Sequence, residues 1–306
     1  MRWQFKAALM HFFSVWPCGD HLHYWTQRNV TKSLPRSEQE FREKFGHAKS
    51  HLDALTRHGR KAISNSQFYE FGAGWDLAIP FCLYALGVKS QILVDIFRLA
   101  HVELLNDALE MVRRVEEESG PTRMAARFVP EEERDTWVRL LEEWYGIRYL
   151  VPCDARGTGL PSESVDYITS TDTLEHIPDE DVRLILQECR RILRKDGVLS
   201  FLIDYHDHYS YCDHRITAYN FLQYPPNTWK WFNPRFHFQN RLRHRDYIRL
   251  AEGQGFEVVE EIRDAILPKD LVDLEQLNVA RPFKNGYRLD ELAVRRGHLV
   301  LRPADA

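Results

Sequence analysis

The chain has 306 residues, of which 44% are hydrophobic and 28% are charged, and its formal net charge is -4 at pH 7. One α/β core with added elements accounts for this length, and the ordinary composition excludes a disordered or collagen-like protein. The small negative charge gives no overall attraction to nucleic acid or to anionic lipid, so we expect neither as a partner.

The first 66 residues predict a helical N-terminal extension. Ser37-Glu38-Gln39-Glu40 has the pattern of a helix cap, and apolar residues follow it at helical spacing as far as residue 60. The longest apolar run near the N-terminus is too short to cross a bilayer, and no secretory cleavage site is convincing.

From residue 67 onward, predicted strands alternate with predicted helices. We expect strands at 67–71, 91–95, 147–151, 165–170 and 198–203, with helices at 77–86, 101–115, 131–144 and 179–193. Two more strands are expected at 256–262 and 298–301. This order predicts an α/β fold with a doubly wound, mostly parallel, seven-stranded (Rossmann-like) sheet that binds ligands at the carboxyl ends of its strands.

An insertion rich in histidine and aromatic residues separates the fifth and sixth strands. It spans residues 204–247 and has no clear periodicity. We expect it beside the strand ends, near the substrate site. Its aromatic residues either line a substrate pocket or pack the insertion onto the sheet, and packing is the default interpretation: Tyr219, Phe221, Tyr224, Trp229, Trp231 and Phe232.

The cysteines indicate a reducing environment. The five residues are an odd number and include no C-x-x-C pair, which argues against a disulfide framework and a zinc ribbon: Cys18, Cys82, Cys153, Cys189 and Cys212. We therefore expect a cytoplasmic protein.

Two features of the first two strands predict an adenosine-containing cofactor. Glu70-Phe71-Gly72-Ala73-Gly74 spans the end of the first strand and the turn after it, and its glycines let the backbone approach a ligand closely. Asp95 closes the second strand about 20 residues later, where an acid can accept hydrogen bonds from both ribose hydroxyls. The glycine segment and Asp95 are compatible with a nicotinamide cofactor as well as with S-adenosylmethionine (SAM).

The charge around the glycines favours SAM. A turn that binds pyrophosphate offers free amides at a helix N-terminus and avoids added negative charge. Here Glu70 and Asp76 flank the glycines, and the third glycine of the dinucleotide pattern is missing. An amino-acid cation fits this loop better than a pyrophosphate.

At these positions the chain resembles the class I (Rossmann-like) SAM-dependent methyltransferase family, over about residues 67–205 and the last two strands. Glu70 to Gly74 looks like the E-x-G-x-G turn of that family, Asp95 like its ribose-binding acid, and Cys153-Asp154-Ala155 like its adenine-contacting turn. The segment 165–177 is the most specific match, and 191–199 is similar to the R-x-L-K-P-G-G turn. Asp76 replaces the usual glycine and Asp196 the usual proline, which leaves both loop conformations open.

The resemblance implies a role for each matching residue. Glu70, Gly72, Ala73 and Gly74 would face the methionine part of SAM, Asp95 and Ile96 the ribose and adenine, Asp154 and Ala155 the adenine, and Thr171 the region near sulfur. Structural roles remain open for some of them: Asp95 as a solvated strand end, Asp154 as a turn cap and Glu175-His176 as a helix start. The methyltransferase domain would span 67–306, with residues 1–66 as a candidate lid.

The residues that act on the acceptor are predicted from chemistry alone. The sulfonium of SAM already activates the methyl group, so the enzyme aligns a nucleophile and removes a proton. His206 and His208 follow the fifth strand and alternate with acids, so we predict one of them as the general base. The cluster that they form with Asp204, Asp207, Asp213 and His214 could alternatively hold a divalent metal or be an ordinary loop, and we predict no metal site.

The sequence thus predicts methyl transfer to O or N of a small-molecule acceptor, such as a sugar or secondary metabolite. Two alternatives remain at this point. One is a nicotinamide-dependent oxidoreductase on the same fold, and the other is a non-catalytic SAM-fold protein that binds a partner.

Overall fold

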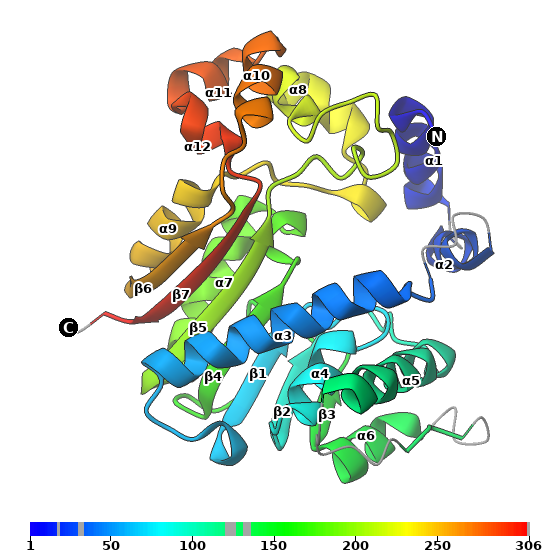
Figure 1. Ribbon diagram of the computed structural model, residues 1–306, viewed down its shortest axis with the longest axis vertical. Helices are drawn as coiled ribbons and strands as arrows, with labels where there is room; N and C mark the ends of the chain where they lie inside the picture. Colours follow the sequence, from blue (N-terminus) through cyan, green and yellow to red (C-terminus); the bar gives the residue numbers. More distant parts are fainter. Residues whose placement is uncertain (17–18, 30–33, 120–126, 131–135, 305–306) are drawn as a thin grey trace.

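The structure is a computed structural model that describes residues 1–16, 19–29, 34–119, 127–130 and 136–304. Its centre is a seven-stranded sheet with helices on both faces, and further helices lie beyond one end of the strands (Figure 1). Among the described residues, no helix is both long enough and apolar enough to cross a bilayer.

The strand order of the sheet is β3-β2-β1-β4-β5-β7-β6. The strands are β1 (Gln67–Phe71), β2 (Ser90–Val94), β3 (Ile147–Leu150), β4 (Val165–Thr171), β5 (Leu193–Asp204), β6 (Phe256–Arg263) and β7 (Arg296–Pro303). The first five pair in parallel, whereas β7 is antiparallel to both β5 and β6. The predicted doubly wound, mostly parallel sheet is confirmed.

Helices cover both faces of the sheet, which explains why every residue of β4 is buried. One core lies under α3 (Glu38–His58), α4 (Ala78–Ala85), α5 (Val102–Ser119) and α6 (Trp137–Tyr145). A second core on the other face contains residues of α7 (Asp179–Ile192) and α9 (His244–Glu252). The predicted helix at 131–144 is α6 in part, and residues 131–135 lie outside the described residues.

The predicted capped helix is confirmed as α3, which crosses one face of the sheet (Figure 1). The side chain of Ser37 accepts a hydrogen bond from the Glu40 amide, and the Glu40 carboxylate accepts one from the Ser37 amide. This reciprocal pair satisfies amides that the first helical turn would otherwise leave without partners. The buried residues of α3 recur every three or four positions and face the core: Phe41, Phe45, Ala48, Leu52 and Leu55.

The boundary between α7 and β5 differs from the prediction. We expected a helix to residue 193 and a strand from residue 198, but α7 ends at Ile192 and β5 begins at Leu193. Leu193 already pairs with Val165 of β4, and a register shift follows before the regular ladder of Tyr167 and Val198. Because this strand starts irregularly, the sequence pattern does not reveal where it begins.

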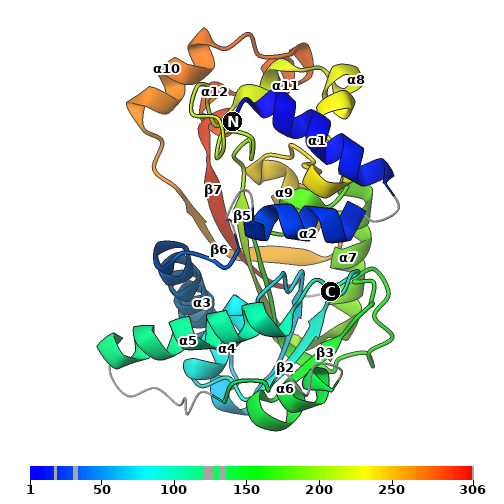
Figure 2. The ribbon, with the colours of Figure 1, turned by 90° about the vertical axis from the view of Figure 1, so that its right-hand side faces the viewer.

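A third hydrophobic core lies beyond the carboxyl ends of the strands, and we call the elements around it the cap. The cap combines α1 (Trp3–Val15), residues 205–243 of the insertion, and α10 (Pro268–Gln276), α11 (Arg281–Gly286) and α12 (Leu289–Ala293). Figures 1 and 2 show these parts together at the top of the molecule, with α2 (Gly19–Asn29) beside them. The sequence did not predict α10, α11 and α12.

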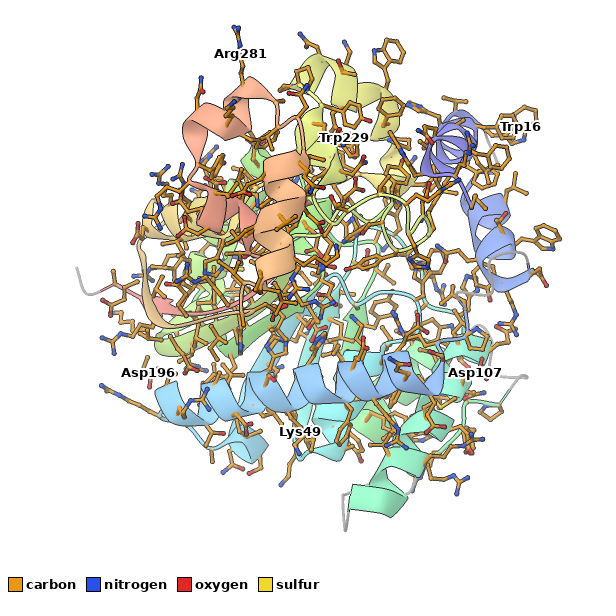
Figure 3. All side chains as sticks on the ribbon, turned by 45° about the horizontal axis from the view of Figure 1, so that its top comes forward. Trp16, Lys49, Asp107, Asp196, Trp229 and Arg281 are labelled. Atoms are coloured by element: carbon orange, nitrogen blue, oxygen red, sulfur yellow. The ribbon has the colours of Figure 1, made fainter. Side chains whose placement is uncertain are left out.

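The aromatic residues of the insertion mainly pack the cap. Tyr219, Phe221 and Trp229 are buried in its core, whereas the side chain of Trp231 is 66% exposed. Figure 3 shows Trp229 among the packed side chains of the cap and Trp16 at the outer edge of the molecule. Packing is therefore the role that the structure supports for the buried members of the set.

Four cysteines are free thiols in the structure: Cys82, Cys153, Cys189 and Cys212. The fifth, Cys18, lies outside the described residues.

Candidate functional site

A pocket of about 650 Å³ opens at the carboxyl ends of the parallel strands. It lies where the strand order reverses between β1 and β4, which is the usual ligand site of doubly wound sheets. The sheet contributes residues that follow β1, β2, β3 and β4, α3 contributes Lys44, and the cap contributes Arg235, Phe236 and Phe238.

The structure brings all nine predicted cofactor-binding residues together around this pocket. They come from four separate parts of the chain: Glu70, Gly72, Ala73, Gly74, Asp95, Ile96, Asp154, Ala155 and Thr171. Their contacts with SAM stay predictions. The predicted bases His206 and His208 do not line the pocket; both lie beside it, next to Asp204.

The glycine turn after β1 needs glycine for two reasons. Gly72 and Gly74 have φ angles of 76° and 77°, in the left-handed region that other residues avoid. A Cβ atom on Gly72 would also overlap the side chain of Thr173, whereas one on Gly74 would meet nothing within 4 Å. The turn is therefore pressed against the end of β4 at Gly72 and is open toward the pocket at Gly74.

Asp76, where the chain departs from the family pattern, has a clear structural role. Its carboxylate accepts a hydrogen bond from Arg36 Nε at 2.6 Å and one from the Ala78 amide at 3.3 Å. The first contact ties the segment before α3 to the glycine turn, and the second satisfies an amide at the start of α4. Aspartate at this position thus adds an ion pair and a hydrogen bond to the first amide of α4, which a glycine could not provide.

Glu70 is a buried carboxylate near the end of β1, just before the glycine turn, with 3% of its surface exposed. Thr169 Oγ donates a hydrogen bond to it at 2.9 Å. Burial raises the pKa of Glu70 to about 7, although the Thr169 hydrogen bond and the Lys44 charge oppose the shift. A bound ammonium group would stabilise the ionised form, as expected if the amino group of SAM binds here.

The raised pKa predicts that cofactor affinity depends on pH. In the free protein Glu70 takes up a proton as the pH falls through about 7, and a neutral carboxyl attracts an ammonium group less. We expect the affinity for S-adenosylhomocysteine to fall by about 20-fold between pH 7.5 and pH 5.5, as the ionised fraction does. Calorimetric titration across this range measures the effect.

The matched variant for this prediction is Glu70→Gln. It keeps the shape of the side chain but removes the titrating group, so its binding should be weaker than wild type at pH 7.5 and should change little with pH. The same pH dependence in both proteins would show that another group is responsible.

Asp95 lies at the end of β2 and faces the pocket half-buried. Its carboxylate accepts hydrogen bonds from the amides of Phe97 at 3.2 Å and Gly74 at 3.5 Å. These contacts orient the carboxylate across the glycine turn and leave lone pairs for a ligand. The neighbouring Ile96 side chain is 51% exposed at the rim of the pocket, where an apolar ring could cover it.

Removal of the Asp95 carboxylate should weaken SAM binding. Two charge-assisted hydrogen bonds to a ribose contribute about 1.5–3 kcal/mol, so Asp95→Ala should raise the dissociation constant about tenfold or more. Asp196→Ala is the control, because Asp196 is exposed and lies outside the pocket lining. Equal dissociation constants for both folded variants would remove Asp95 from the ribose site.

Asp154 and Thr171 line the pocket while their side chains already have protein partners. Asp154 pairs with Arg156 at 2.6 Å, which holds the pKa of Asp154 below its ordinary value, and it also accepts the Arg156 amide. The Thr171 hydroxyl lies 2.9 Å from His51 Nε2. The turn-capping role of Asp154 is therefore seen in the structure, and a contact with adenine would use its remaining lone pairs.

Acidic and basic side chains meet next to the pocket at the ends of β4 and β5. Lys44 Nζ donates to Asp172 Oδ2 at 2.7 Å, and Asp204 contacts His206, His208 and Tyr211. Burial opposes ionisation of Asp204, but its contacts with His206 and His208 outweigh burial and keep the pKa of Asp204 well below the ordinary value.

Glu175 and His176 lie in the same region, directly after β4. Burial, with the charges of Asp172 and Asp204, raises the pKa of Glu175 well above its ordinary value. Burial also lowers the pKa of His176, to about 4, so that its imidazole is neutral near pH 7. The structure thus places a buried carboxyl group beside a neutral imidazole at the edge of the pocket.

Sequence reasoning missed several residues that line the pocket: Arg36, Lys44, Trp75, Asp172, His176, Arg235, Phe236 and Phe238. Asp172 and His176 belong to the most specific family match, so their position after a strand was available as a signal. Lys44 and Arg235 reach the pocket only through tertiary packing, which no local pattern encodes.

Comparison with known proteins supports the assignment that fold and pocket suggest. Residues 132–201 match the model of a family described as a methyltransferase domain. The matched segment includes β3, β4 and α7, which carry the turn at Asp154 and the end of β4 at Thr171. The match covers part of the chain and agrees with the resemblance to class I SAM-dependent methyltransferases that the sequence motifs show. No curated protein matches the sequence significantly.

Solved structures are similar at low sequence identity. A putative sarcosine dimethylglycine methyltransferase from Galdieria sulphuraria is 16% identical, with a TM-score of 0.44 and coverage of 86% of each chain. The PH0226 protein from Pyrococcus horikoshii OT3 is 14% identical, with a TM-score of 0.49 and coverage of 92% of this chain and 98% of that chain. The 1,6-didemethyltoxoflavin-N1-methyltransferase from Burkholderia thailandensis is 13% identical, with a TM-score of 0.47 and coverage of 92% and 86%.

Proposed function

We propose that this enzyme transfers the methyl group of SAM to an oxygen or nitrogen atom of a small molecule, such as a sugar or a secondary metabolite. The observation that carries the proposal is the pocket itself, which gathers the nine predicted cofactor residues and is also lined by residues of the cap. In the reaction the acceptor atom bonds to the methyl carbon, the carbon–sulfur bond breaks, and S-adenosylhomocysteine leaves.

The size and cover of the pocket support a small acceptor. A volume of about 650 Å³ lies within the range of small-ligand sites. Arg235, Phe236 and Phe238 of the cap and Arg36 before α3 line it. A large acceptor would have to displace these elements before its reacting atom could reach the methyl group.

The N-terminal extension, residues 1–66, is proposed as a lid over the methyltransferase domain, residues 67–306. Tyr24 of α2 stacks on His101 at 4.1 Å and on Trp75 at 5.6 Å between ring centroids. Trp75 lines the pocket, so this stack connects α2 to the site. The extension also supplies Arg36 and Lys44, and movement of α2 would open this side of the pocket.

We propose His206 as the general base that takes up the acceptor's proton. Its Nδ1 atom lies 2.5 Å from Asp204 Oδ1, so the carboxylate accepts the Nδ1 hydrogen and leaves Nε2 as the basic atom. Asp204 would then stabilise the imidazolium that forms when the acceptor loses its proton. The cytoplasmic location predicted from the cysteines is part of the same proposal and agrees with the four free thiols.

The proposal is tested by incubating the protein with SAM and a panel of sugars, phenols and amines, and by following S-adenosylhomocysteine and the methylated product by mass spectrometry. We expect product with at least one small acceptor class. Methylation of added protein or nucleic acid, with every small molecule inert, would contradict the acceptor assignment. A protein that binds NAD and fails to bind SAM would contradict the cofactor.

A further inference from the structure

Glu175 is a buried carboxyl group without a partner for its side chain. It is 3% exposed, and neither carboxylate oxygen has a hydrogen-bond partner among the described residues. The neighbouring acids have theirs, because Asp172 pairs with Lys44 and Asp204 contacts His206. An unpaired polar group in such a place is costly unless something binds to it.

His176 is oriented like a histidine that binds a metal ion. Its Nδ1 atom lies 2.8 Å from the backbone carbonyl oxygen of Phe238. Since a carbonyl only accepts hydrogen bonds, Nδ1 carries the hydrogen and Nε2 carries the free lone pair. A second hydrogen bond of this kind commonly fixes the ring of a metal ligand.

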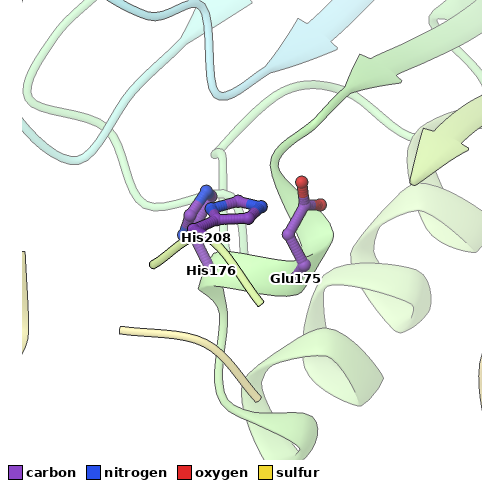
Figure 4. Close-up of side chains that lie close together, drawn as sticks. All are labelled: Glu175, His176 and His208. Atoms are coloured by element: carbon purple, nitrogen blue, oxygen red, sulfur yellow. The ribbon is translucent and has the colours of Figure 1, made fainter. Parts of the chain in front are cut away.

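His208 completes the group from the start of the insertion. Its ring centroid is 4.8 Å from that of His176, and the two planes make an angle of 63°. Its Nε2 atom is buried without a hydrogen-bond partner among the described residues, although it lies 3.3 Å from Asp204 Oδ2. Figure 4 shows the two imidazole rings side by side, next to the Glu175 carboxylate.

One ligand atom from each of the three residues lies within 4.8 Å of the others. Two atoms bound to one ion at about 2.1 Å are at most about 4.2 Å apart, so small side-chain rotations bring all three into range. We propose that Glu175, His176 and His208 bind one divalent transition-metal ion. Two imidazoles and one carboxylate suit first-row ions such as Zn²⁺, Co²⁺, Mn²⁺ or Fe²⁺ and suit Mg²⁺ poorly.

This site differs from the cluster that the sequence suggested. Asp207 accepts hydrogen bonds from Asn220 and the Tyr209 amide, and Asp213 pairs with Arg215. His214 is exposed. Asp207 and Asp213 therefore already have protein partners, and His214 faces the solvent. His208 is the metal ligand that the insertion supplies.

The position of the site gives the ion access to the acceptor. His176 lines the pocket, so an ion bound to it lies at the pocket's edge. Three protein ligands leave positions for oxygen atoms of water or of an acceptor hydroxyl. A role of the ion in binding the acceptor rests on the proposed methyl transfer. Binding of the ion by the three side chains does not depend on that proposal.

The test uses the full chain after treatment with a chelator, with neither SAM nor acceptor present. Calorimetric titration with Zn²⁺, and with Co²⁺ followed by its visible absorption, should show one ion bound per chain, and excess Mg²⁺ should not displace it. Glu175→Gln and His208→Asn should each weaken binding by more than about 100-fold, beyond the 10–100-fold expected of a residue that only supports a ligand.

His214→Asn is the matched control, because it removes an exposed histidine of the same segment and should bind as wild type does. Circular dichroism checks that each variant is folded. If Glu175→Gln does not fold, His208→Asn alone provides the test. Absence of a bound ion, or equal affinity in wild type and both ligand variants, would overturn the inference. If the protein methylates its acceptor under those conditions, the proposed function stands without the metal.

Discussion

Replacement of His206 by alanine should lower turnover by about 10²–10⁴-fold and leave the dissociation constant of SAM nearly unchanged. His206 is held by Asp204, which is itself 3% exposed and well oriented by its contact with Tyr211. In the proposed reaction the pair acts on the acceptor's proton and not on the cofactor, so only the chemical step should lose stabilisation. Single-turnover kinetics and calorimetric SAM binding measure the two effects separately.

His206 does not line the pocket, and catalytic hydrogen bonds often tighten only when the substrate is bound. His214→Ala is the control for loss of a histidine from this segment, since His214 is exposed. Asp204→Asn should also lower turnover, because the amide no longer stabilises the imidazolium. Near-normal turnover in both His206→Ala and His208→Ala would show that the histidines after β5 have only a structural role.

The second large effect is expected at Gly72. Gly72→Ala should lower the free energy of unfolding by about 2–5 kcal/mol, because a left-handed residue with a Cβ atom costs about 1–2 kcal/mol and an overpacked contact about 1–3 kcal/mol. The contact in question is the overlap with Thr173. Urea denaturation without cofactor measures the change.

Gly74→Ala separates the two causes. Gly74 has nearly the same φ angle, but a Cβ atom there meets nothing within 4 Å. This variant should therefore lose only the backbone part, about 1–2 kcal/mol. Thr173→Ala in the Gly72→Ala protein should recover part of the difference, since it removes the nearest atoms. Equal losses in the two single variants would show that Thr173 does not matter.

The sheet and the nine pocket-lining residues at the ends of its strands were predictable because their signals are local. Glu70 and Gly72 lie within three positions at the end of β1, Asp95 follows a strand with a continuous apolar run, and recognisable helices follow β1, β2 and β4. Once the strands are parallel, their carboxyl ends meet at one edge. That geometry brings residues together that are far apart in the sequence.

The cap and the side chains that meet near the ends of β4 and β5 could not be predicted from local patterns. The helices α10, α11 and α12 have nine, six and five residues, too few for periodicity to be recognised. Pro268 and Pro282 at their starts were the available signals. The Lys44–Asp172 pair joins residues 128 positions apart. His176 and His208 likewise come from different elements, and only tertiary structure places them side by side.

The cap draws on both ends of the chain, which constrains the order in which the protein can fold. The Trp3 ring packs on Phe232 at 4.8 Å and on Tyr209 at 5.4 Å, and the Trp3 amide donates to Asp213 at 3.0 Å. α1 precedes the sheet in the sequence, and it cannot make these contacts until the chain has been made as far as Tyr209, Asp213 and Phe232. The sheet from β1 to β5 precedes these partners in the sequence. The strands β1 to β5 have therefore been made before α1 can dock on the cap, and until then the Trp3 ring lacks these partners.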